Sequence, residues 1–459
     1  MDRHSTSSEH NLAKAQGALS RHFDARLFWA DRATQEARAA LFNAERTVNP
    51  IGLVSCRDVA DVRFALSVAQ DYGIPVSVLA GGHDPSARSV KDNAIVLDLR
   101  MMNHATFMRE QDLVHVGGGA ITRNVLDHLP PDKAAVTGTF QTVGLPSFVM
   151  GGGYGRLNSY FGMGLDQLVE ADLLLADGSK IRVSGTQEQD LFWAIRGGGG
   201  NFGVVTGMTL RVHSVPSLLS ALLLFALPDA KEAMLLVQLE IDDAEQHGSL
   251  FSGFMASPIG DPVYFLAPLW IGDREKGEQW IERLCSWQGA QVVSRQWSVY
   301  RDLFSEEFEQ RWPKGRPYRL NVQNVGTMTP EIADLLIEGA HLFTSSMSSI
   351  VIHDVHGAAT RVGSRETAFP MRQNHYAVQI IAGWNKETEP DEHRAWADEL
   401  SDKLAAHSLR GAYINLLHPD EESRARDFYG DSARRLSALK RRYDPSYRFV
   451  APGSLATSD

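Results

Sequence analysis

The sequence predicts an α+β protein with two lobes, and three observations lead to this prediction. The chain has 459 residues, which exceeds the size of about 100 to 200 residues usual for one domain. Up to Val215-Pro216, short strand patterns alternate with short helical patterns and with glycine clusters. After Pro216, longer apolar strands alternate with long amphipathic helices, a pattern typical of one sheet backed by helices.

The first elements follow directly from local signals. From about Leu12 to Ala44, apolar side chains recur with helical spacing, and Asn49-Pro50 ends this pattern. A short strand over Gly52–Val54 comes next. The Ser55-x-x-Asp58 sequence predicts the start of a helix that continues over Val59–Tyr72.

Gly73 is expected to cap this helix, because glycine adopts the left-handed conformation found after many helices. Ile74 to Leu79 reads as a second strand, after which the Gly81-Gly82 turn delivers His83. Further strands are expected over 94–97, 113–116, 168–175, 180–183, 204–212, 221–227, 264–270, 348–355 and 376–384.

Composition and charge exclude several classes of protein. Hydrophobic residues make up 43% of the chain and charged residues 22%, as in an ordinary globular protein. A net charge of −11 and a pI near 5.8 argue against nucleic-acid binding, which requires a basic surface. The one basic run, Lys440-Arg441-Arg442, lies on a helical pattern and is expected to form a solvated helix face.

Cys56 and Cys285 are far apart and without a partner motif, so a disulfide framework and a cysteine metal site are not expected, and both read as core residues. The first residues lack the apolar run of a signal peptide, and no window approaches 18 consecutive apolar residues. We therefore expect a cytoplasmic protein that does not bind a membrane.

Glycine clusters allow backbone N–H groups to approach phosphates closely, and they occur at 81–82, 117–119, 151–155 and 197–203. Gly198-x-Gly200-x-x-Gly203 fits a dinucleotide fingerprint, but it follows a helical pattern and precedes a strand, the reverse of the Rossmann order. The chain has no Gly-Lys dipeptide, no H-E-x-x-H and no G-x-S-x-G. A P-loop, a zincin-type metal site and a serine nucleophile elbow are therefore not expected.

Five blocks carry a family resemblance, and they follow one another in register over about 370 residues. They are AGGHDP (Ala80 to Pro85), TGTFQTVG (Thr137 to Gly144), GGGYGRLNSYFGMGLD (Gly151 to Asp166), DLFWAIRGGGGNFGVVT (Asp190 to Thr206), and YIN with FYG, RL, LK and YDP (Tyr413 to Pro445). In these blocks the chain resembles the berberine-bridge-enzyme-like FAD-linked oxidases of the vanillyl-alcohol-oxidase type. Among known members it resembles the bacterial 6-hydroxynicotine oxidases most.

The resemblance implies a domain organisation and an activity. Residues 1–46 would form an N-terminal helical segment, 47–215 the FAD-binding domain, 216–408 an antiparallel-sheet substrate domain backed by helices, and 409–459 a segment returning to the FAD domain. The enzyme would transfer a hydride from a small organic substrate to FAD, and O2 would reoxidise the flavin and give H2O2.

The resemblance also implies the cofactor residues. His83 matches the histidine bonded to the 8α carbon of the flavin, an attachment that raises the oxidising power of the flavin. The segment around it would wrap the pyrophosphate, a second stretch would follow the isoalloxazine and ribityl chain, a third would contact the adenosine half, and the C-terminal stretch would return to the ring. The set is Val78, Leu79, Ala80, Gly81, Gly82, His83, Asp84, Gly138, Thr142, Val143, Gly144, Ser147, Phe148, Tyr154, Gly200, Val205, Tyr413 and Asn415.

Three positions depart from the family pattern. Phe140 stands where doubly linked members carry cysteine, so a single link through His83 is expected. Ala87 replaces a glycine found in many relatives. Leu416 replaces the tyrosine that often serves as the catalytic base, so another residue must supply that group, or the enzyme uses none.

The candidate catalytic residues are Asp354, His356 and Tyr413. Asp354 resembles the acidic residue that other members place over the flavin. If 348–355 is a strand, Asp354 and His356 share one face with Ile352, and His353 lies on the other face with Val351 and Ser349. A strand-end cap or a surface pair is the structural alternative for Asp354 and His356.

Alternatives of other classes remain open. Leu416 supports a flavin-fold protein that binds a small molecule without converting it, and a dehydrogenase with another electron acceptor is the second alternative. In plant members the residue at Val143 gates oxygen, and valine permits the reaction. An amine, an alcohol and a polyketide all remain candidate substrates, because aromatic residues in the second lobe are more often core than ligand contacts: Trp270, Trp280, Trp297, Tyr300, Phe304, Trp312, Tyr318, Tyr376 and Trp384.

Overall fold

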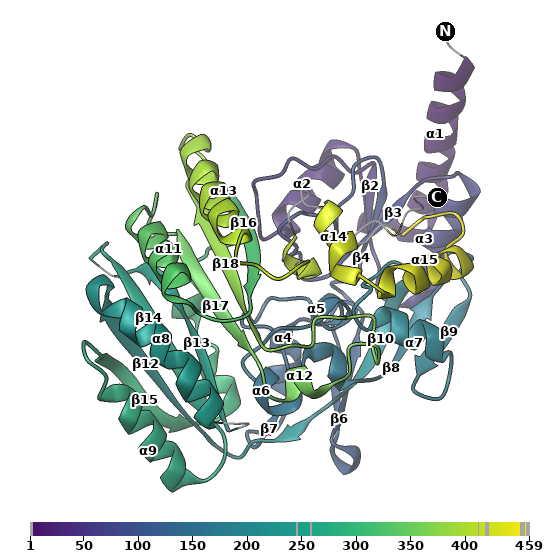
Figure 1. Cartoon of the computed structure of the whole chain (residues 1–459). Coiled ribbons are helices and arrows are strands. Elements are labelled where there is room, and N and C mark those ends of the chain that lie inside the picture. The colour runs from purple at the N-terminus through teal and green to yellow at the C-terminus, as the bar shows by residue number, and fades with distance from the viewer. Residues whose placement is uncertain are drawn as a thin grey trace.

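The structure, a computed structural model, describes residues 3–244, 247–257, 259–411, 413–417, 422–449 and 455. Two lobes lie side by side in Figure 1, one built from the N-terminal 215 residues and the other around a large sheet. Of the expected C-terminal segment 409–459, residues 412, 418–421, 450–454 and 456–459 fall outside the described part. None of the helices that the structure describes is long and apolar enough to cross a membrane.

The first lobe contains two principal sheets. A four-stranded sheet has the order β1-β2-β4-β3, with bounds Leu27–Trp29, Gly52–Ser55, Ile95–Asp98 and Val76–Leu79. Here β2 and β3 both run parallel to β4 and are connected by helix α3 (Val59–Asp71). An antiparallel sheet has the order β5-β6-β10-β8-β9, with bounds Ala105–Met108, Leu113–Gly117, Val204–Arg211, Leu168–Leu174 and Lys180–Ser184. This lobe is therefore mixed α/β, as the alternating pattern predicts.

The second lobe is one seven-stranded antiparallel sheet. Its order is β15-β12-β14-β13-β17-β18-β16, with bounds Gln291–Ser298, Leu218–Ala226, Pro262–Trp270, Gly248–Ala256, Ser349–Val355, His375–Gly383 and Tyr318–Val325. Helices cover one face of this sheet (Figure 1): α8 (Leu227–Ala244), α9 (Arg274–Cys285), α11 (Pro330–His341) and α13 (Asp391–Ala405). The other face is directed toward the first lobe, where the cavity described below lies.

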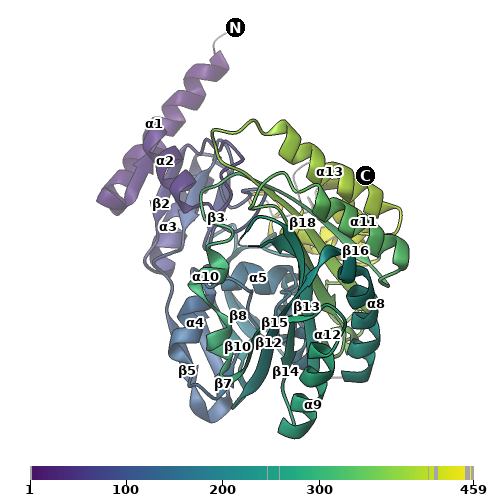
Figure 2. The ribbon, with the colours of Figure 1, turned by 90° about the vertical axis from the view of Figure 1, so that its left-hand side faces the viewer.

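The remaining helices belong to the first lobe or connect the two. They are α1 (Arg3–Phe23), α2 (Asp31–Ala40), α4 (Thr122–His128), α5 (Leu145–Gly151), α6 (Asn158–Phe161), α7 (Gln189–Ile195), α10 (Glu306–Glu309), α12 (Ala358–Arg361), α14 (Glu422–Tyr429) and α15 (Ser432–Tyr443). The N-terminal part of α1 projects from the body of the molecule (Figure 2). Two short strands, β7 (Lys133–Ala134) and β11 (His213–Ser214), pair with each other.

The N-terminal helix differs from the expected continuous pattern over Leu12–Ala44. It is interrupted by β1, which pairs antiparallel with β2. The absence of a side chain at Gly52 makes this pairing possible, because a Cβ there would lie 2.6 Å from the ring of Trp29. Helix α3 begins at Val59, as expected, but its N-cap is Asp58 and not Ser55: the side chain of Asp58 accepts the hydrogen bond from the Asp61 amide.

Helix α15 contains a buried ion pair that differs from the expected solvated face. Lys440 is 2% exposed and Asp444 is 0% exposed, with 2.6 Å between Nζ and the carboxylate. The ammonium also donates to the carbonyls of Asn201 and Phe449. Phe449 also forms a bridge with Val76, so the ion pair helps to hold the segment around Phe449 beside β3.

Candidate functional site

A cavity of about 350 Å³ lies between the two lobes, a volume typical of small-molecule and cofactor sites. Its first wall comes from the first lobe and the C-terminal segment. That wall includes residues of the turn after β3, the loop before α5, the glycine loop after α7, and the stretch at 413–416. The sheet supplies the opposite wall.

The turn after β3 is shaped by glycine. A Cβ on Gly81 would lie 2.2 Å from the amide nitrogen of Gly144, so the two loops can meet only without that side chain. Gly82 has φ +69°, a conformation that favours glycine, and a Cβ there would lie 2.4 Å from the Ala40 carbonyl. This close approach carries the chain from β3 into the cavity and presents His83 there.

His83 lines the cavity inside an aromatic surround. Its ring stacks on Phe42, with 4.4 Å between centroids and an interplanar angle of 25°, and Phe140 lies 5.8 Å away. Nε2 lies 2.7 Å from Thr142 Oγ1. Burial, together with the positive charge of Lys314, lowers the pKa of His83 to about 3. The imidazole is therefore neutral at neutral pH.

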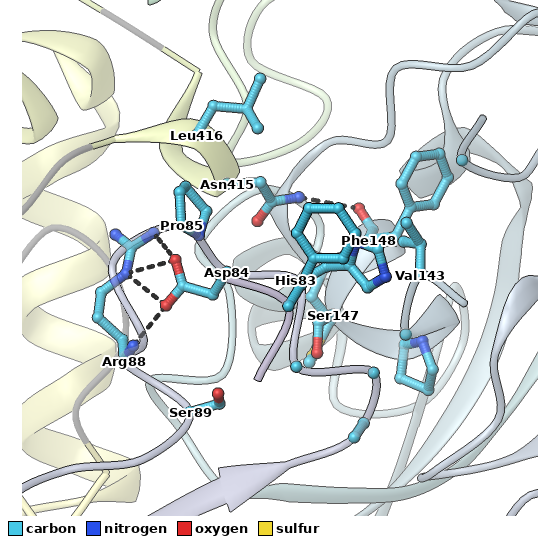
Figure 3. Close-up of a pocket in the computed structure, with 18 of the residues that line it drawn as sticks. His83, Asp84, Pro85, Arg88, Ser89, Val143, Ser147, Phe148, Asn415 and Leu416 are labelled. Carbon is cyan, nitrogen blue, oxygen red and sulfur yellow. Dashed lines mark hydrogen bonds and ion pairs between the residues drawn. The ribbon is translucent and has the colours of Figure 1, made fainter. Parts of the chain in front are cut away.

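Asp84 and Arg88 form a closed pair beside His83 (Figure 3). The guanidinium donates from Nη2 to Oδ1 at 2.6 Å and from Nε to Oδ2 at 2.9 Å. Asp84 also accepts the amides of Ser86 and Arg88, so its carboxylate organises the whole turn. Within that turn Ala87 has φ +54°, which accounts physically for the glycine found there in many relatives.

The C-terminal segment reaches the same cavity through Tyr413 and Asn415. The Tyr413 hydroxyl accepts the Gly153 amide at 2.8 Å and the Asn415 side-chain amide at 2.9 Å. Burial raises the pKa of Tyr413 against these two hydrogen bonds. Asn415 also donates to the Phe148 carbonyl at 3.3 Å (Figure 3).

The glycines at the end of α5 make room for these two side chains. A Cβ on Gly151 would lie 1.9 Å from Asn415 Oδ1. A Cβ on Gly152 would lie 2.7 Å from the Tyr413 ring. This part of the GGGYG block therefore accommodates side chains of the C-terminal segment, whereas the sequence pattern suggested an approach to phosphate.

The expected cofactor residues converge on the cavity with two exceptions. Leu79, the last residue of β3, is fully buried in the core. Thr142 does not line the cavity, but its hydroxyl group contacts the ring of His83, which does. The others line it: Val78, Ala80, Gly81, Gly82, His83, Asp84, Gly138, Val143, Gly144, Ser147, Phe148, Tyr154, Gly200, Val205, Tyr413 and Asn415. Phe140 and Leu416 line it as well.

The expected position of Asp354 over the flavin is corrected by the structure. Asp354 and His356 do not belong to the cavity lining. On β17, Val351 and His353 face the cavity, whereas the even-numbered Ile350 and Ile352 pack in the core beneath the helices. Asp354 is even-numbered as well, so its side chain leaves the strand on the same face as Ile350 and Ile352, away from the cavity.

Asp354 has a structural role instead. Its Oδ2 accepts the Leu250 amide at 3.1 Å, at the place where the ladder between β13 and β17 would otherwise continue. It also lies 3.1 Å from Nδ1 of His356. Burial would raise the pKa of Asp354, but the hydrogen bond and charge of His356 outweigh it and hold that pKa below its ordinary value. This arrangement matches the strand-end alternative.

The sheet-side wall contains residues that the sequence did not single out. Its polar side chains for which the described part of the chain gives no hydrogen bond are those of His353 and Gln379, and its apolar ones are Phe251, Phe308, Leu320, Val351 and Ile381. The alternation of side chains along a strand already placed His353 and Asp354 on opposite faces, but it did not show which face lines the cavity. Of the aromatic residues noted in the sequence, Trp312 and Tyr318 line the cavity, whereas Trp270, Trp280, Tyr376 and Trp384 belong to the core beneath the helices.

Within the described residues, no group of three or more His, Cys, Asp or Glu side chains is placed to hold a metal ion. The two cysteines lie apart from the cavity, Cys56 in the core of the first lobe and Cys285 at the end of α9.

Comparison with known proteins agrees with this geometry. Residues 50–184 match the family described as FAD binding domain, and residues 412–455 match the family described as berberine and berberine like. The chain is 26% identical to an FAD-linked oxidoreductase of Gibberella zeae, over 93% of this chain and 85% of that relative. It is 25% identical to the tetrahydroberberine oxidase of Berberis wilsoniae, over 89% of this chain and 86% of that relative.

A solved structure shares the whole fold. The 6-hydroxy-D-nicotine oxidase of Arthrobacter nicotinovorans superimposes with a TM-score of 0.83 at 22% sequence identity, covering 94% of this chain and 97% of that chain. The two-lobed α+β architecture is therefore the fold of this 6-hydroxy-D-nicotine oxidase.

Proposed function

Because this chain is a berberine-bridge-enzyme-like FAD-linked oxidoreductase, we propose that it is an oxidase whose FAD is bonded to His83 alone. A small organic substrate would lie against the seven-stranded sheet. The position of His83 inside the cavity, with a neutral ring oriented by Thr142, carries this proposal.

The residues of the first wall fit FAD. Gly81 and Gly144 let two backbone segments come together where a side chain would keep them apart, which leaves amide groups available for phosphate oxygens. The glycine loop with Gly200 and the strand residue Val205 would hold the adenosine half. Tyr413 and Asn415 would meet the flavin ring, where amide and hydroxyl groups can hydrogen-bond its polar edge.

His83 is suited to covalent attachment. A neutral imidazole keeps a lone pair on one ring nitrogen, and the low pKa of His83 means that protonation does not compete for it above about pH 4. Phe42 stacks on the ring and Thr142 holds Nε2, so the orientation of the imidazole is fixed from two sides. A ring held in this way can bond to an electron-poor carbon brought beside it.

Two observations favour a single bond. Phe140 lines the cavity at the position where a second, cysteine-based link would require sulfur. Neither free cysteine lines the cavity.

When bound, FAD supplies the acceptor for a hydride from the substrate carbon and passes the electrons to O2. The residues of this chain would surround the cofactor and the substrate. The first wall holds the cofactor, and the sheet excludes water with a largely apolar surface. Val143 lines the cavity, where its short β-branched side chain would leave space for oxygen.

The dehydrogenase and the non-catalytic binding protein remain the competing functions. Leu416 lines the cavity, so the usual tyrosine hydroxyl is absent from that position, which is the observation favouring a protein that only binds. Reoxidation of the reduced protein by air separates an oxidase from a dehydrogenase, and reduction of the flavin by a substrate separates both from a protein that only binds.

Acid precipitation tests the attachment. The purified protein should give a yellow pellet, and digestion should place the flavin on one peptide that contains His83. In His83→Ala the flavin should remain in the supernatant, whereas the exposed-residue variant His341→Ala should keep a yellow pellet. A colourless wild-type pellet would show that the flavin is not covalently bound.

A further inference from the structure

We propose that the sheet-side wall binds an uncharged aromatic substrate and hydrogen-bonds its hydroxyl group between His353 and Gln379. This inference rests on the proposed function, because it places the substrate in the same cavity as the cofactor. The sequence left an amine, an alcohol and a polyketide open as substrates, and this inference favours an aromatic compound with a hydroxyl group over an amine and over a carbohydrate.

His353 and Gln379 are neighbours on one face of the sheet. In the register of β17 and β18, Val351 pairs with Gln379 and His353 pairs with Ala377. His353 and Gln379 are therefore diagonal neighbours, whose Cβ atoms in antiparallel sheets lie about 7–8 Å apart or less. A single hydroxyl group fits between two such side chains.

The polar groups of these two side chains are available to hydrogen-bond a ligand. Among the described residues, the structure gives no hydrogen bond to the imidazole of His353 or to the amide of Gln379, although both line the cavity. Burial lowers the pKa of His353 to about 4, so its ring is neutral and offers one donor and one acceptor. A hydroxyl group can donate to the imidazole and accept from the amide.

The other polar groups of this wall are already engaged. Trp312 donates from Nε1 to Ser349 Oγ at 3.0 Å, and the Tyr318 hydroxyl donates to the Pro313 carbonyl at 2.8 Å. The Asn43 amide bonds the backbone of Pro85 and Tyr318. A carbohydrate would therefore leave most of its hydroxyl groups without partners on this wall, which disfavours it.

Aromatic rings form much of the remaining surface. Phe308 and Trp312 lie 5.3 Å apart, and Phe140 lies about 6 Å from each of them. Phe251 also lines the cavity, and its ring centroid lies 4.9 Å from that of His353. Because aromatic rings pack well at these separations, a planar aromatic substrate fits the surface.

The charges around the cavity disfavour an ionised substrate. The charged residues that line it are Asp84 and Arg88, and they neutralise each other on the opposite wall. Arg156 lies over Phe251 at 5.1 Å but outside the lining, and it interacts with the charge of Asp354. A buried ammonium would find no unpaired carboxylate among the described lining residues, and a cation–π contact is weaker than the desolvation cost of the charge.

Binding to the purified yellow holoenzyme under anaerobic conditions tests this inference. The probes are benzyl alcohol, benzylamine, cellobiose and toluene, and the dissociation constants come from calorimetry and from tryptophan fluorescence. Benzyl alcohol should bind at least about tenfold more tightly than benzylamine at pH 7 and than cellobiose. Equal or tighter binding of either competitor would overturn the substrate class.

Variants test the two polar residues. His353→Phe and Gln379→Leu should each reduce the ratio of benzyl alcohol to toluene affinity about five- to tenfold, because each removes one hydrogen bond to the hydroxyl group. His341→Phe and Gln291→Leu change exposed residues and should leave that ratio unchanged. Flavin content and melting temperature confirm that each variant folds. An unchanged ratio in both cavity variants would overturn the role of His353 and Gln379.

The two proposals can fail separately. A protein purified without flavin contradicts the proposed function before any ligand is added. A yellow protein that prefers benzylamine or cellobiose contradicts the substrate class alone.

Discussion

Nε2 of His83 lies 2.7 Å from the hydroxyl oxygen of Thr142, a residue that does not itself line the cavity. This hydrogen bond orients the imidazole that we propose to carry FAD. Thr142→Val keeps the shape of the side chain and removes the hydroxyl, so covalent attachment should be about five- to tenfold slower while FAD still binds. The measurement is the acid-precipitated flavin over time after FAD is added to apoprotein.

Thr139→Val is the matched control for Thr142→Val. Thr139 lies in the same loop and lines the cavity, but it does not contact His83 through a hydrogen bond in the structure. Its variant should attach flavin at the wild-type rate. Equal rates in all three proteins would show that Thr142 has no part in attachment.

Asp354→Asn should affect stability more than catalysis. The carboxylate accepts the Leu250 amide and lies 3.1 Å from His356, and it does not line the cavity. Loss of its charge should lower the free energy of unfolding by about 1–3 kcal/mol. Anaerobic flavin reduction should stay within a few-fold of the wild-type rate. A hundredfold loss, the usual worth of a positioned base, would restore Asp354 to the mechanism.

The stability difference between wild type and Asp354→Asn should depend on pH. The folded protein holds the pKa of Asp354 below its ordinary value of 3.8. The unfolded chain therefore takes up the proton first as the pH falls, and the stabilisation present at neutral pH is lost below about pH 4. Urea titrations at pH 7, 5 and 3.5 should show the difference narrowing at the lowest pH, whereas a constant difference would contradict this assignment.

Val143→Leu tests the electron acceptor. Valine lines the cavity, and leucine reaches one carbon further into it. Photoreduced wild-type protein should reoxidise in air within seconds and release H2O2, and the variant should do so at least about tenfold more slowly, with unchanged anaerobic reduction. Wild-type protein that stays reduced in air but reduces a dye would be a dehydrogenase, and protein that no substrate reduces would favour binding alone.

Gly151→Ala should disrupt the C-terminal part of the cofactor site. The new Cβ would lie 1.9 Å from Asn415 Oδ1, so the Asn415 side chain must leave its position beside Tyr413. We expect a lower flavin content and a lower melting temperature. Gly185→Ala is the control, because a Cβ there meets nothing within 4 Å. Full flavin content in Gly151→Ala would show that the contact is not required.

The family resemblance brought together the residues that line the first wall of the cavity. The sequence itself indicated only that the Gly81-Gly82 turn presents His83 after a strand, because a glycine turn is a short-range signal. The face of β17 that meets the cavity could not be predicted. All residues of this strand are buried, since helices cover one face and the first lobe covers the other, so no polar alternation distinguishes the two faces.

The burial of the charged Lys440 side chain could not be predicted from the local sequence either. A run of three basic residues on a helix usually lies in solvent, and the side chain of Asp444 was visible one turn away. The two carbonyl groups that make burial possible belong to Asn201 and Phe449, and the position of Asn201 depends on a loop more than 200 residues distant. Pairing across such a distance leaves no trace in a local pattern.

The return of the C-terminal segment to the turn after β3 sets the order of events during biosynthesis. The carbonyl of Ile414 accepts a hydrogen bond from Arg88, and the carbonyl of Leu417 accepts one from Ser86, so these contacts form only after the chain has been synthesised beyond Leu417. Domains generally fold as they emerge from the ribosome, but this pocket is closed by residues that are translated long after the turn that they contact. Maturation to the yellow protein should therefore be post-translational, and a nascent chain arrested before Tyr413 should remain colourless.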